Sequence, residues 1–179
     1  MKGIEQNLEK YISDQEISKR VKEISNEISL LYCDKNPILI GILNGSFIFM
    51  SDLIRQLNIN CEIDFIKISS YLGKKSIGKI NMSKGLDFDI KNRSVIIVED
   101  IIDSGKSINY LHDYISNLKP KDIAVISLLA KKGASKLNFK IDFIGFEISS
   151  EFVVGYGLDY NQKLRNLKSI YKLKEPHIW

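Results

Sequence analysis

The chain has 179 residues, with 26 Lys and Arg against 22 Asp and Glu, and only two cysteines. This length suits one domain, and the small basic excess is spread along the chain, which argues against binding to nucleic acid. Cys33 and Cys61 have no CxxC spacing and are too few for a disulfide framework, so we interpret both as small core residues in a reducing compartment.

The first segment, "MKGIEQNLEKYISDQE", carries acids and lacks the apolar run of a signal peptide, and no later window approaches a membrane-spanning length. We therefore expect a cytoplasmic protein that binds no membrane. Ser13 followed by Glu16 fits a capping box, and the apolar residues after it recur at alternating steps of four and three. They are Ile17, Val21, Ile24, Ile28 and Leu31, which predict an amphipathic helix.

The next segments alternate between strand and helix. "PILIGIL" (37–43) is a short apolar run that ends at a turn, and "FIFMSDLIRQL" (47–57) then resumes helical spacing. "CEIDFIKIS" (61–69) alternates like a strand. The stretch 72–85 is rich in Gly, Lys and Ser with little apolar material, so we expect a mobile excursion there.

Two more buried strands follow, "RSVIIVED" (93–100) and "DIAVISLLA" (122–130), with a helix between them that Pro120 closes. Continuously apolar strands separated by helices predict an α/β fold with a parallel sheet flanked by helices on both faces. Ligands bind at the carboxyl ends of such strands, so the loops at 43–46, 99–107 and 130–133 are candidates for a site. The tail after "IDFIGFEI" holds short strand-like pieces that we expect to pack with the N-terminal segment.

The stretch "VEDIIDSGKS" (98–107) combines three acids with the end of a phosphate-binding loop. A P-loop of a nucleotide kinase would require glycine at position 100, where this chain has Asp100. A helix that begins near Ser104 to Ser107 still offers unpaired N–H groups, hydroxyls and a lysine to one phosphate. Glu99 and Asp100 can accept hydrogen bonds from a diol or help to hold Mg²⁺. A ribose 5-phosphate satisfies both halves of the stretch.

"VIIVEDIIDSGKS" closely resembles the 5-phosphoribosyl 1-diphosphate signature of type I phosphoribosyltransferases, in the form found in hypoxanthine and hypoxanthine-guanine phosphoribosyltransferases. The resemblance continues through "GILNGSF", "SLLAKK", "DFIGFEI" and "FVVGYGLDYNQKLRNL" and covers nearly the whole chain. It implies a Rossmann-like fold with a twisted parallel sheet, and a single domain over residues 1–179. It also implies a lid at about 70–85 and a small hood formed by the N-terminal segment and residues 148–179.

The resemblance also implies roles for individual residues. Ribose and its 5-phosphate would be bound by Glu99, Asp100, Asp103, Ser104, Gly105, Lys106 and Ser107. The diphosphate would be bound by Leu43, Asn44, Gly45 and Arg165, with backbone groups serving where many members have a basic residue in place of Asn44. The purine would be bound by Lys131, Phe152, Val153 and Asp159. Mg²⁺ would be held by Glu99, Asp100 and Asp159, and the lid would contain Ser70 and Tyr71.

The implied activity is purine salvage, in which hypoxanthine, and also guanine, reacts with 5-phosphoribosyl 1-diphosphate to give the nucleoside 5′-monophosphate and diphosphate. Asp103 would be the general base at purine N7, and Lys131 would favour 6-oxopurines over adenine. A homodimer or homotetramer is implied as well. Two alternatives are a phosphoribosyl-diphosphate-binding regulator of RNA and a phosphoribosyltransferase for another base. Taken alone, Lys131 could be solvated, Phe152 could be core, and Asp159 with Arg165 could be a surface ion pair.

Overall fold

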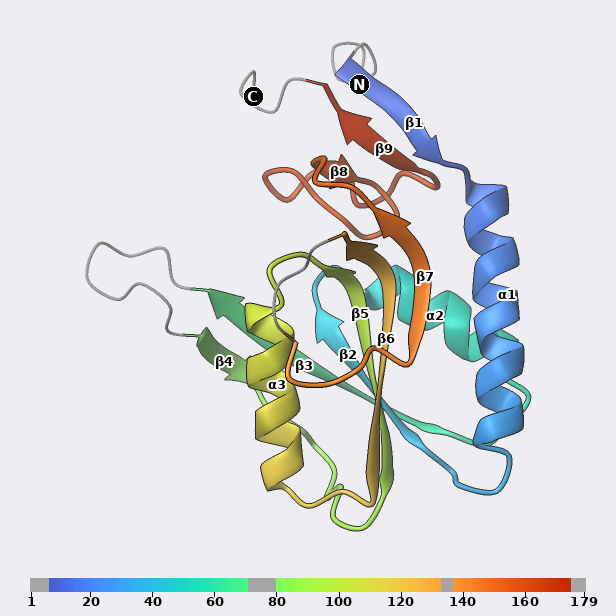
Figure 1. Cartoon of the computed structure of the whole chain (residues 1–179), viewed down its shortest axis with the longest axis vertical. Helices are drawn as coiled ribbons and strands as arrows, with labels where there is room; N and C mark the ends of the chain where they lie inside the picture. Colours follow the sequence, from blue (N-terminus) through green and yellow to red (C-terminus); the bar gives the residue numbers. More distant parts are fainter. Residues whose placement is uncertain (1–6, 71–79, 133–136, 175–179) are drawn as a thin grey trace.

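The computed structural model describes residues 7–70, 80–132 and 137–174 (Figure 1). Strands and helices alternate through the middle of the chain, as the periodicity predicts. The helices are α1 (Asp14–Leu31), α2 (Phe47–Gln56) and α3 (Lys106–Asn117). The strands are β1 (Leu8–Ile12), β2 (Ile38–Leu43), β3 (Glu62–Ser70), β4 (Ile80–Lys84), β5 (Ser94–Ile102), β6 (Asp122–Lys131), β7 (Phe143–Ile148), β8 (Val153–Val154) and β9 (Ile170–Leu173).

The central sheet has six strands in the order β4-β3-β2-β5-β6-β7. Its β2–β3, β2–β5, β5–β6 and β6–β7 pairs are parallel, and only β4 runs antiparallel, against β3. The prediction of an α/β fold with a largely parallel sheet is confirmed. Of the segment 72–85, for which we expect a mobile excursion, residues 72–79 lie outside the described residues, and residues 80–84 form an unpredicted edge strand that pairs with β3.

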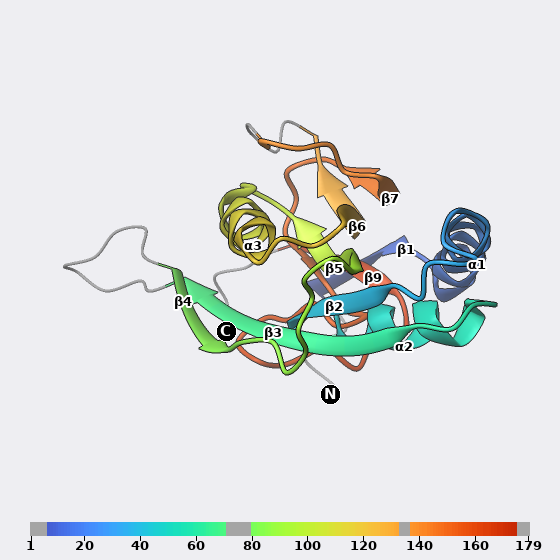
Figure 2. The same cartoon turned by 90° about the horizontal axis from the view of Figure 1, so that it is seen from below.

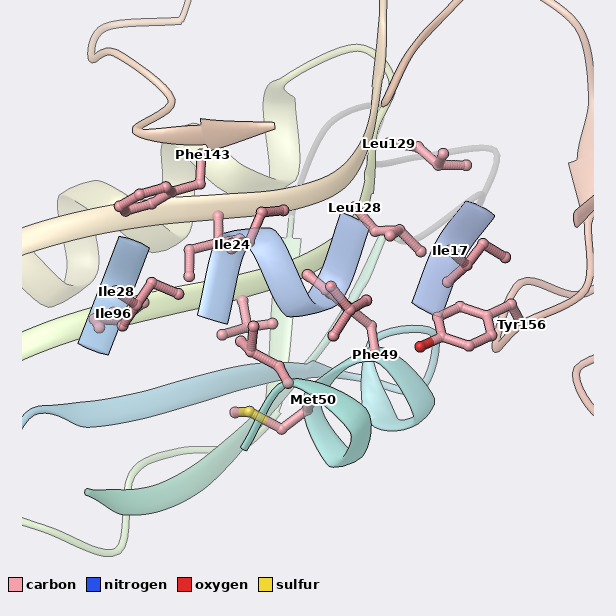
Figure 3. Packing of buried hydrophobic residues seen from close by; sticks show 14 of the residues in the cluster. Ile17, Ile24, Ile28, Phe49, Met50, Ile96, Leu128, Leu129, Phe143 and Tyr156 are labelled. Carbon is pink, nitrogen blue, oxygen red and sulfur yellow. The ribbon is translucent and has the colours of Figure 1, made fainter. Parts of the chain in front are cut away.

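Helices cover both faces of this sheet (Figure 2). Along β5, Val95 and Ile97 belong to the cluster that includes the buried face of α3, whereas Ile96 and Val98 belong to the cluster that includes α1 and α2. Successive side chains of a strand point to opposite faces, so a continuously apolar strand fits a sheet that is covered twice. Figure 3 shows the cluster under α1 and α2, with Phe49 among its labelled residues.

The helix α1 starts at the predicted capping box. The Ser13 hydroxyl accepts a hydrogen bond from the Glu16 N–H at 3.2 Å, and the Ser13 N–H donates to the Glu16 carboxylate at 2.9 Å. The three isoleucines and the valine of the predicted stripe are buried, but Leu31 at the helix end is 59% exposed. The stripe therefore ends one turn earlier than the sequence predicts.

Both terminal segments join in a second, three-stranded sheet of order β1-β9-β8, whose strands are antiparallel. Figure 1 shows this sheet, which we call the hood, above the carboxyl ends of the central strands. The interpretation of the cysteines as core residues is wrong for Cys33, which is exposed, while Cys61 is partly buried. Across the described ranges, no helix is long and apolar enough to span a membrane.

Candidate active site

Three loops meet where β2, β5 and β6 end beneath the hood (Figure 1). Because the strands are parallel, their carboxyl ends lie at the same edge of the sheet, and the loops that leave them are neighbours in space. These are the loops at 43–46, 99–107 and 130–133 that the sequence singles out, of which residue 133 lies outside the described part of the chain. The strand β5 continues past Glu99 and Asp100 to Ile102, so both acids stand on the strand itself.

The loop from Asp103 to Ser107 encloses a small cavity of about 90 Å³. Ser104, Gly105 and Ser107 line it together with Glu99 of β5. Gly105 has a φ of 75°, a conformation that glycine adopts without steric cost, and α3 begins at the next residue. The first N–H groups of a helix lack partners within the helix and carry the positive end of its dipole. The cavity therefore has the size and polarity for one phosphate group.

Glu99 and Asp100 are adjacent acids near the end of β5, and burial raises the pKa of both. Glu99 is buried, and its Oε2 atom has no hydrogen-bond partner. Burial, and then the charge of Asp100, raise the pKa of Glu99 well above its usual value. Burial also raises the pKa of Asp100 to about 6, against hydrogen bonds from backbone N–H groups and the charge of Arg165. An unsatisfied buried carboxylate is costly unless a ligand supplies hydrogen bonds or positive charge.

The raised pKa of Glu99 makes stability depend on pH. The folded protein keeps the Glu99 proton to a higher pH than the unfolded chain, whose pKa is about 4.3. The stabilisation is complete below that unfolded pKa and is lost as the pH rises through the folded pKa. Glu99→Gln removes this titration. The free energy of unfolding of the variant, relative to the unsubstituted protein, should therefore rise as the pH increases from about 5, by at most ~1.4 kcal/mol per pH unit.

Urea unfolding at several pH values in that range measures this difference. Glu147→Gln is a matched control, because Glu147 is an exposed residue of β7. A difference for Glu99→Gln that stays constant with pH, or that the control reproduces, would contradict the account of Glu99.

The loop from Leu43 to Ser46 lies directly against Asp100. It begins with a cis peptide bond between Leu43 and Asn44. A Cβ atom at Gly45 would overlap the Asp100 carboxylate, and a Cβ atom at Gly157 would overlap the carbonyl oxygen of Gly45. Because neither glycine has a side chain, the Gly45 backbone packs against the Asp100 carboxylate and the Gly157 backbone packs against Gly45, which brings three distant segments together.

Asp159 and Arg165 form an ion pair at 2.7 Å, with side chains 25% and 20% exposed. The Arg165 guanidinium also donates to the Gly157 carbonyl at 2.7 Å and to the Gln162 side chain at 3.1 Å. Gly157 packs against Gly45, so the guanidinium of Arg165 is bonded to a residue that itself contacts the loop at 43–46. The simple surface ion pair considered from sequence is thus half-buried and adjoins the site.

A second cavity of about 230 Å³ adjoins the loop at 99–107. Asp103 and Lys131 line it and form an ion pair at 3.1 Å, with side chains 65% and 16% exposed. Phe152 lies on the same cavity, is 44% exposed, and meets the edge of Tyr160 with ring centroids 5.8 Å apart. An exposed aromatic face beside a charged donor and a carboxylate is suited to a flat, polar heterocycle.

The structure brings most of the predicted site residues together. Val153 and Asp159 line the cavity of Phe152, together with Ile101 and Leu158, which no sequence signal singled out. Gly157 was also missed, although two glycines in "VGYGL" are a signal of unusual backbone, and its φ is 100°. Of the lid residues, Tyr71 lies outside the described residues, and Ser70 is described only as the last residue of β3.

The acids fit Mg²⁺ that arrives with a phosphorylated substrate. Mg²⁺ prefers oxygen ligands and is usually held by one or two carboxylates together with substrate phosphates. Glu99 has an unpartnered buried oxygen, and Asp100 has a raised pKa. A bound cation would stabilise the charged form of both carboxylates. Within the described residues, no group of three His, Cys, Asp or Glu side chains could hold a metal ion by itself. The donors therefore suit a metal ion shared with substrate.

Comparisons with known proteins agree with this geometry. The family model described as "Phosphoribosyl transferase domain" matches residues 8–161. Because this model matches most of the chain, the chain belongs to the phosphoribosyltransferase family.

Similar proteins show which phosphoribosyltransferases this chain resembles. The chain is 43% identical to the hypoxanthine-guanine phosphoribosyltransferase of Bacillus subtilis, with 91% of each chain covered. It is 41% identical to the hypoxanthine phosphoribosyltransferase of Escherichia coli, covering 93% of this chain and 95% of the relative. The crystal structure of a Staphylococcus aureus hypoxanthine phosphoribosyltransferase matches with a TM-score of 0.91 at 33% identity, covering 98% and 96% of the two chains. Within the family, the chain groups with the hypoxanthine phosphoribosyltransferases.

Proposed function

We propose that this chain is a purine salvage enzyme that converts hypoxanthine, and also guanine, with 5-phosphoribosyl 1-diphosphate to inosine or guanosine 5′-monophosphate and diphosphate. Its relatives carry the names of enzymes of this activity. The observation that carries the proposal is the pairing of Asp103 with Lys131 at the cavity of Phe152, directly beside the cavity of the phosphate loop. Base and ribose phosphate thus have adjoining sites.

In the proposed reaction, the bond between C1 of the ribose and the diphosphate oxygen breaks as the bond between C1 and purine N9 forms. Asp103 accepts the proton from N7, which makes N9 a better nucleophile. The Lys131 ammonium donates to the oxygen at C6. Phe152 stacks on the base, and the backbone of Val153 meets its edge. The 5-phosphate is held by the first N–H groups of α3 with Ser104, Lys106 and Ser107.

The departing diphosphate needs positive charge and hydrogen-bond donors. We assign these to the backbone N–H groups of the loop at Leu43 to Gly45 and to the guanidinium of Arg165. Glu99 and Asp100 would bind the ribose hydroxyls and, with Asp159, would hold Mg²⁺, which neutralises charge on the diphosphate when it is bound. The contact between Gly45 and Gly157 supports this grouping, because it brings Arg165 and Asp159 toward the glycine loop.

A product assay tests the proposal. The protein is supplied with phosphoribosyl diphosphate and Mg²⁺ and, in turn, with hypoxanthine, guanine, xanthine or adenine, and the nucleotide is identified by mass spectrometry. We expect inosine 5′-monophosphate from hypoxanthine and no comparable product from adenine. Absence of product with all four bases would overturn the proposed activity, and a faster reaction with adenine would overturn the assignment of a 6-oxopurine.

Lys131 should give the enzyme its preference for purines with an oxygen at C6 over adenine, which has an amino group there. Lys131→Met removes a charge-assisted hydrogen bond, so kcat/KM for hypoxanthine should fall about 10- to 150-fold. The preference over adenine should shrink with it, because adenine no longer leaves an ammonium group unpaired. Initial rates with both bases measure the change. Lys132→Met is the matched control, because Lys132 is exposed beside it; an equal loss in both variants would contradict the role of Lys131.

We further propose that the enzyme works in the cytoplasm as a homodimer or homotetramer. The family resemblance supports this assembly. Light scattering of the purified protein measures its mass, and a mass of one chain at micromolar concentration would contradict the proposed assembly.

A further inference from the structure

A hydrogen bond outside the substrate cavities joins two parts of the active site. The Tyr156 hydroxyl donates to the Asp52 carboxylate at 2.7 Å. Asp52 lies in the middle of α2, the helix that follows the glycine loop at 43–46, and Tyr156 precedes Gly157 in the segment that leads to Asp159. The two residues are distant in sequence, and each lies next to one of the two segments that we propose to bind diphosphate.

The Tyr156 ring is a fixed point of the core. It is 6% exposed and packs in the cluster under α1 and α2, where Figure 3 shows it beside Ile17 and Phe49. Its φ is 51°, which is uncommon for an aromatic residue. Its N–H donates to the Leu167 carbonyl at 2.8 Å, so both the backbone and the ring of Tyr156 are held.

Gly157, the residue after Tyr156, links Tyr156 to the candidate site. The Gly157 N–H donates to the Arg165 carbonyl at 2.9 Å, and the Gly157 carbonyl accepts from the Arg165 guanidinium at 2.7 Å. Gly157 also abuts the Gly45 carbonyl. A shift of Tyr156 relative to α2 would therefore change the spacing between the glycine loop and the Asp159–Arg165 pair.

The phenol is suited to this bond. Burial, with the hydrogen bond and charge of Asp52, raises the pKa of Tyr156, so its hydroxyl remains a donor at all working pH values. Asp52 is partly exposed, and its second oxygen is 3.7 Å from the Arg55 guanidinium. Loss of the phenol hydroxyl would thus leave a solvated carboxylate rather than a buried orphan, and the protein should still fold.

We propose that Tyr156 is a positioning residue, which through its hydrogen bond to Asp52 fixes the distance between the glycine loop at 43–46 and the Asp159–Arg165 pair and so tunes the binding of phosphoribosyl diphosphate. This inference rests on the proposed function. Asp159 also lines the purine cavity, but Arg165, Tyr156 and Asp52 do not, so the effect should be larger for phosphoribosyl diphosphate than for the purine.

Steady-state kinetics of four variants test this role. Tyr156→Phe keeps the ring in the core and removes only the hydroxyl, so KM for phosphoribosyl diphosphate should rise roughly 5- to 30-fold, while KM for hypoxanthine should rise less. Asp52→Leu should have the same effect. Asp52→Asn retains an oxygen that accepts from the phenol and should keep a KM close to the original. Tyr32→Phe is the matched control, because Tyr32 is 7% exposed and directly follows α1, whose carboxyl end lies far from the hood (Figure 1).

The outcomes separate positioning from mere stability. A lower thermal midpoint with both KM values unchanged would overturn the inference, as would an Asp52→Asn variant as impaired as Asp52→Leu. An equal rise in both KM values would also overturn it. If the unsubstituted protein forms no nucleotide, the proposed function falls and this inference with it. An active protein with an unaffected Tyr156→Phe variant overturns the inference alone.

Discussion

Asp103→Asn should reduce kcat with hypoxanthine by about 10²- to 10⁴-fold, the usual range for loss of a general acid or base. The amide has the shape of the carboxylate and can still accept from Lys131, so the ion-paired arrangement at 3.1 Å should change little. Its oxygen is a far weaker base and cannot take the proton from purine N7. KM for phosphoribosyl diphosphate should stay within a fewfold of its original value, because the loss lies in the transition state.

Initial rates over a range of both substrate concentrations separate kcat from KM. Asp113→Asn is the matched control, because Asp113 is an exposed acid on α3, the same helix that follows the phosphate loop. A variant at position 103 that turns over at nearly the original rate would remove Asp103 from the chemistry. A rise in KM alone, with kcat retained, would make it a binding residue.

Gly45→Ala should impair both the fold and the binding of phosphoribosyl diphosphate. The added Cβ would overlap the Asp100 carboxylate, and Gly157 packs on the Gly45 carbonyl, so neither neighbour can move without disturbing the other loop. Overpacking of this kind costs about 1–3 kcal/mol. If that cost falls on the substrate complex, KM for phosphoribosyl diphosphate rises about 5- to 150-fold.

Gly85→Ala is the matched control for this substitution. A Cβ atom there would be 3.8 Å from its nearest neighbour, the Tyr114 hydroxyl, which is an ordinary contact. Thermal unfolding and steady-state kinetics of both variants make the comparison. A Gly45→Ala protein with unchanged KM would show that the glycine loop and Asp100 are not held together as the structure has them.

Local sequence patterns predicted most helices and strands, because the spacing of apolar residues within a segment indicates which of its faces are buried. The strand β5 is apolar at every position from Val95 to Val98, which only a sheet covered on both faces explains. The stretch from Glu99 to Ser107 predicted a phosphate loop with adjoining acids for a similar reason, since one continuous segment carries both. The edge strand β4 was missed, because it is short and polar and pairs only on one side.

Contacts between distant segments could not be read in the same way. The Asp103–Lys131 pair and the packing of Gly45 on Asp100 depend on how neighbouring parallel strands align, which no local period encodes. The hydrogen bond from Tyr156 to Asp52 depends on where the hood segment returns over α2. The family resemblance named many of the site residues, but only the fold shows which of them touch.

We propose that one site holds the ribose phosphate on the loop after β5 and presents the purine to Asp103 and Lys131. A crystal structure with inosine 5′-monophosphate, Mg²⁺ and diphosphate measures this directly. We predict N7 within about 2.6–3.2 Å of an Asp103 carboxylate oxygen, the oxygen at C6 at a similar distance from the Lys131 Nζ atom, and the phosphate on the N–H groups of residues 104–107. A nucleotide with its phosphate elsewhere, or with its base turned away from Asp103, would contradict the account.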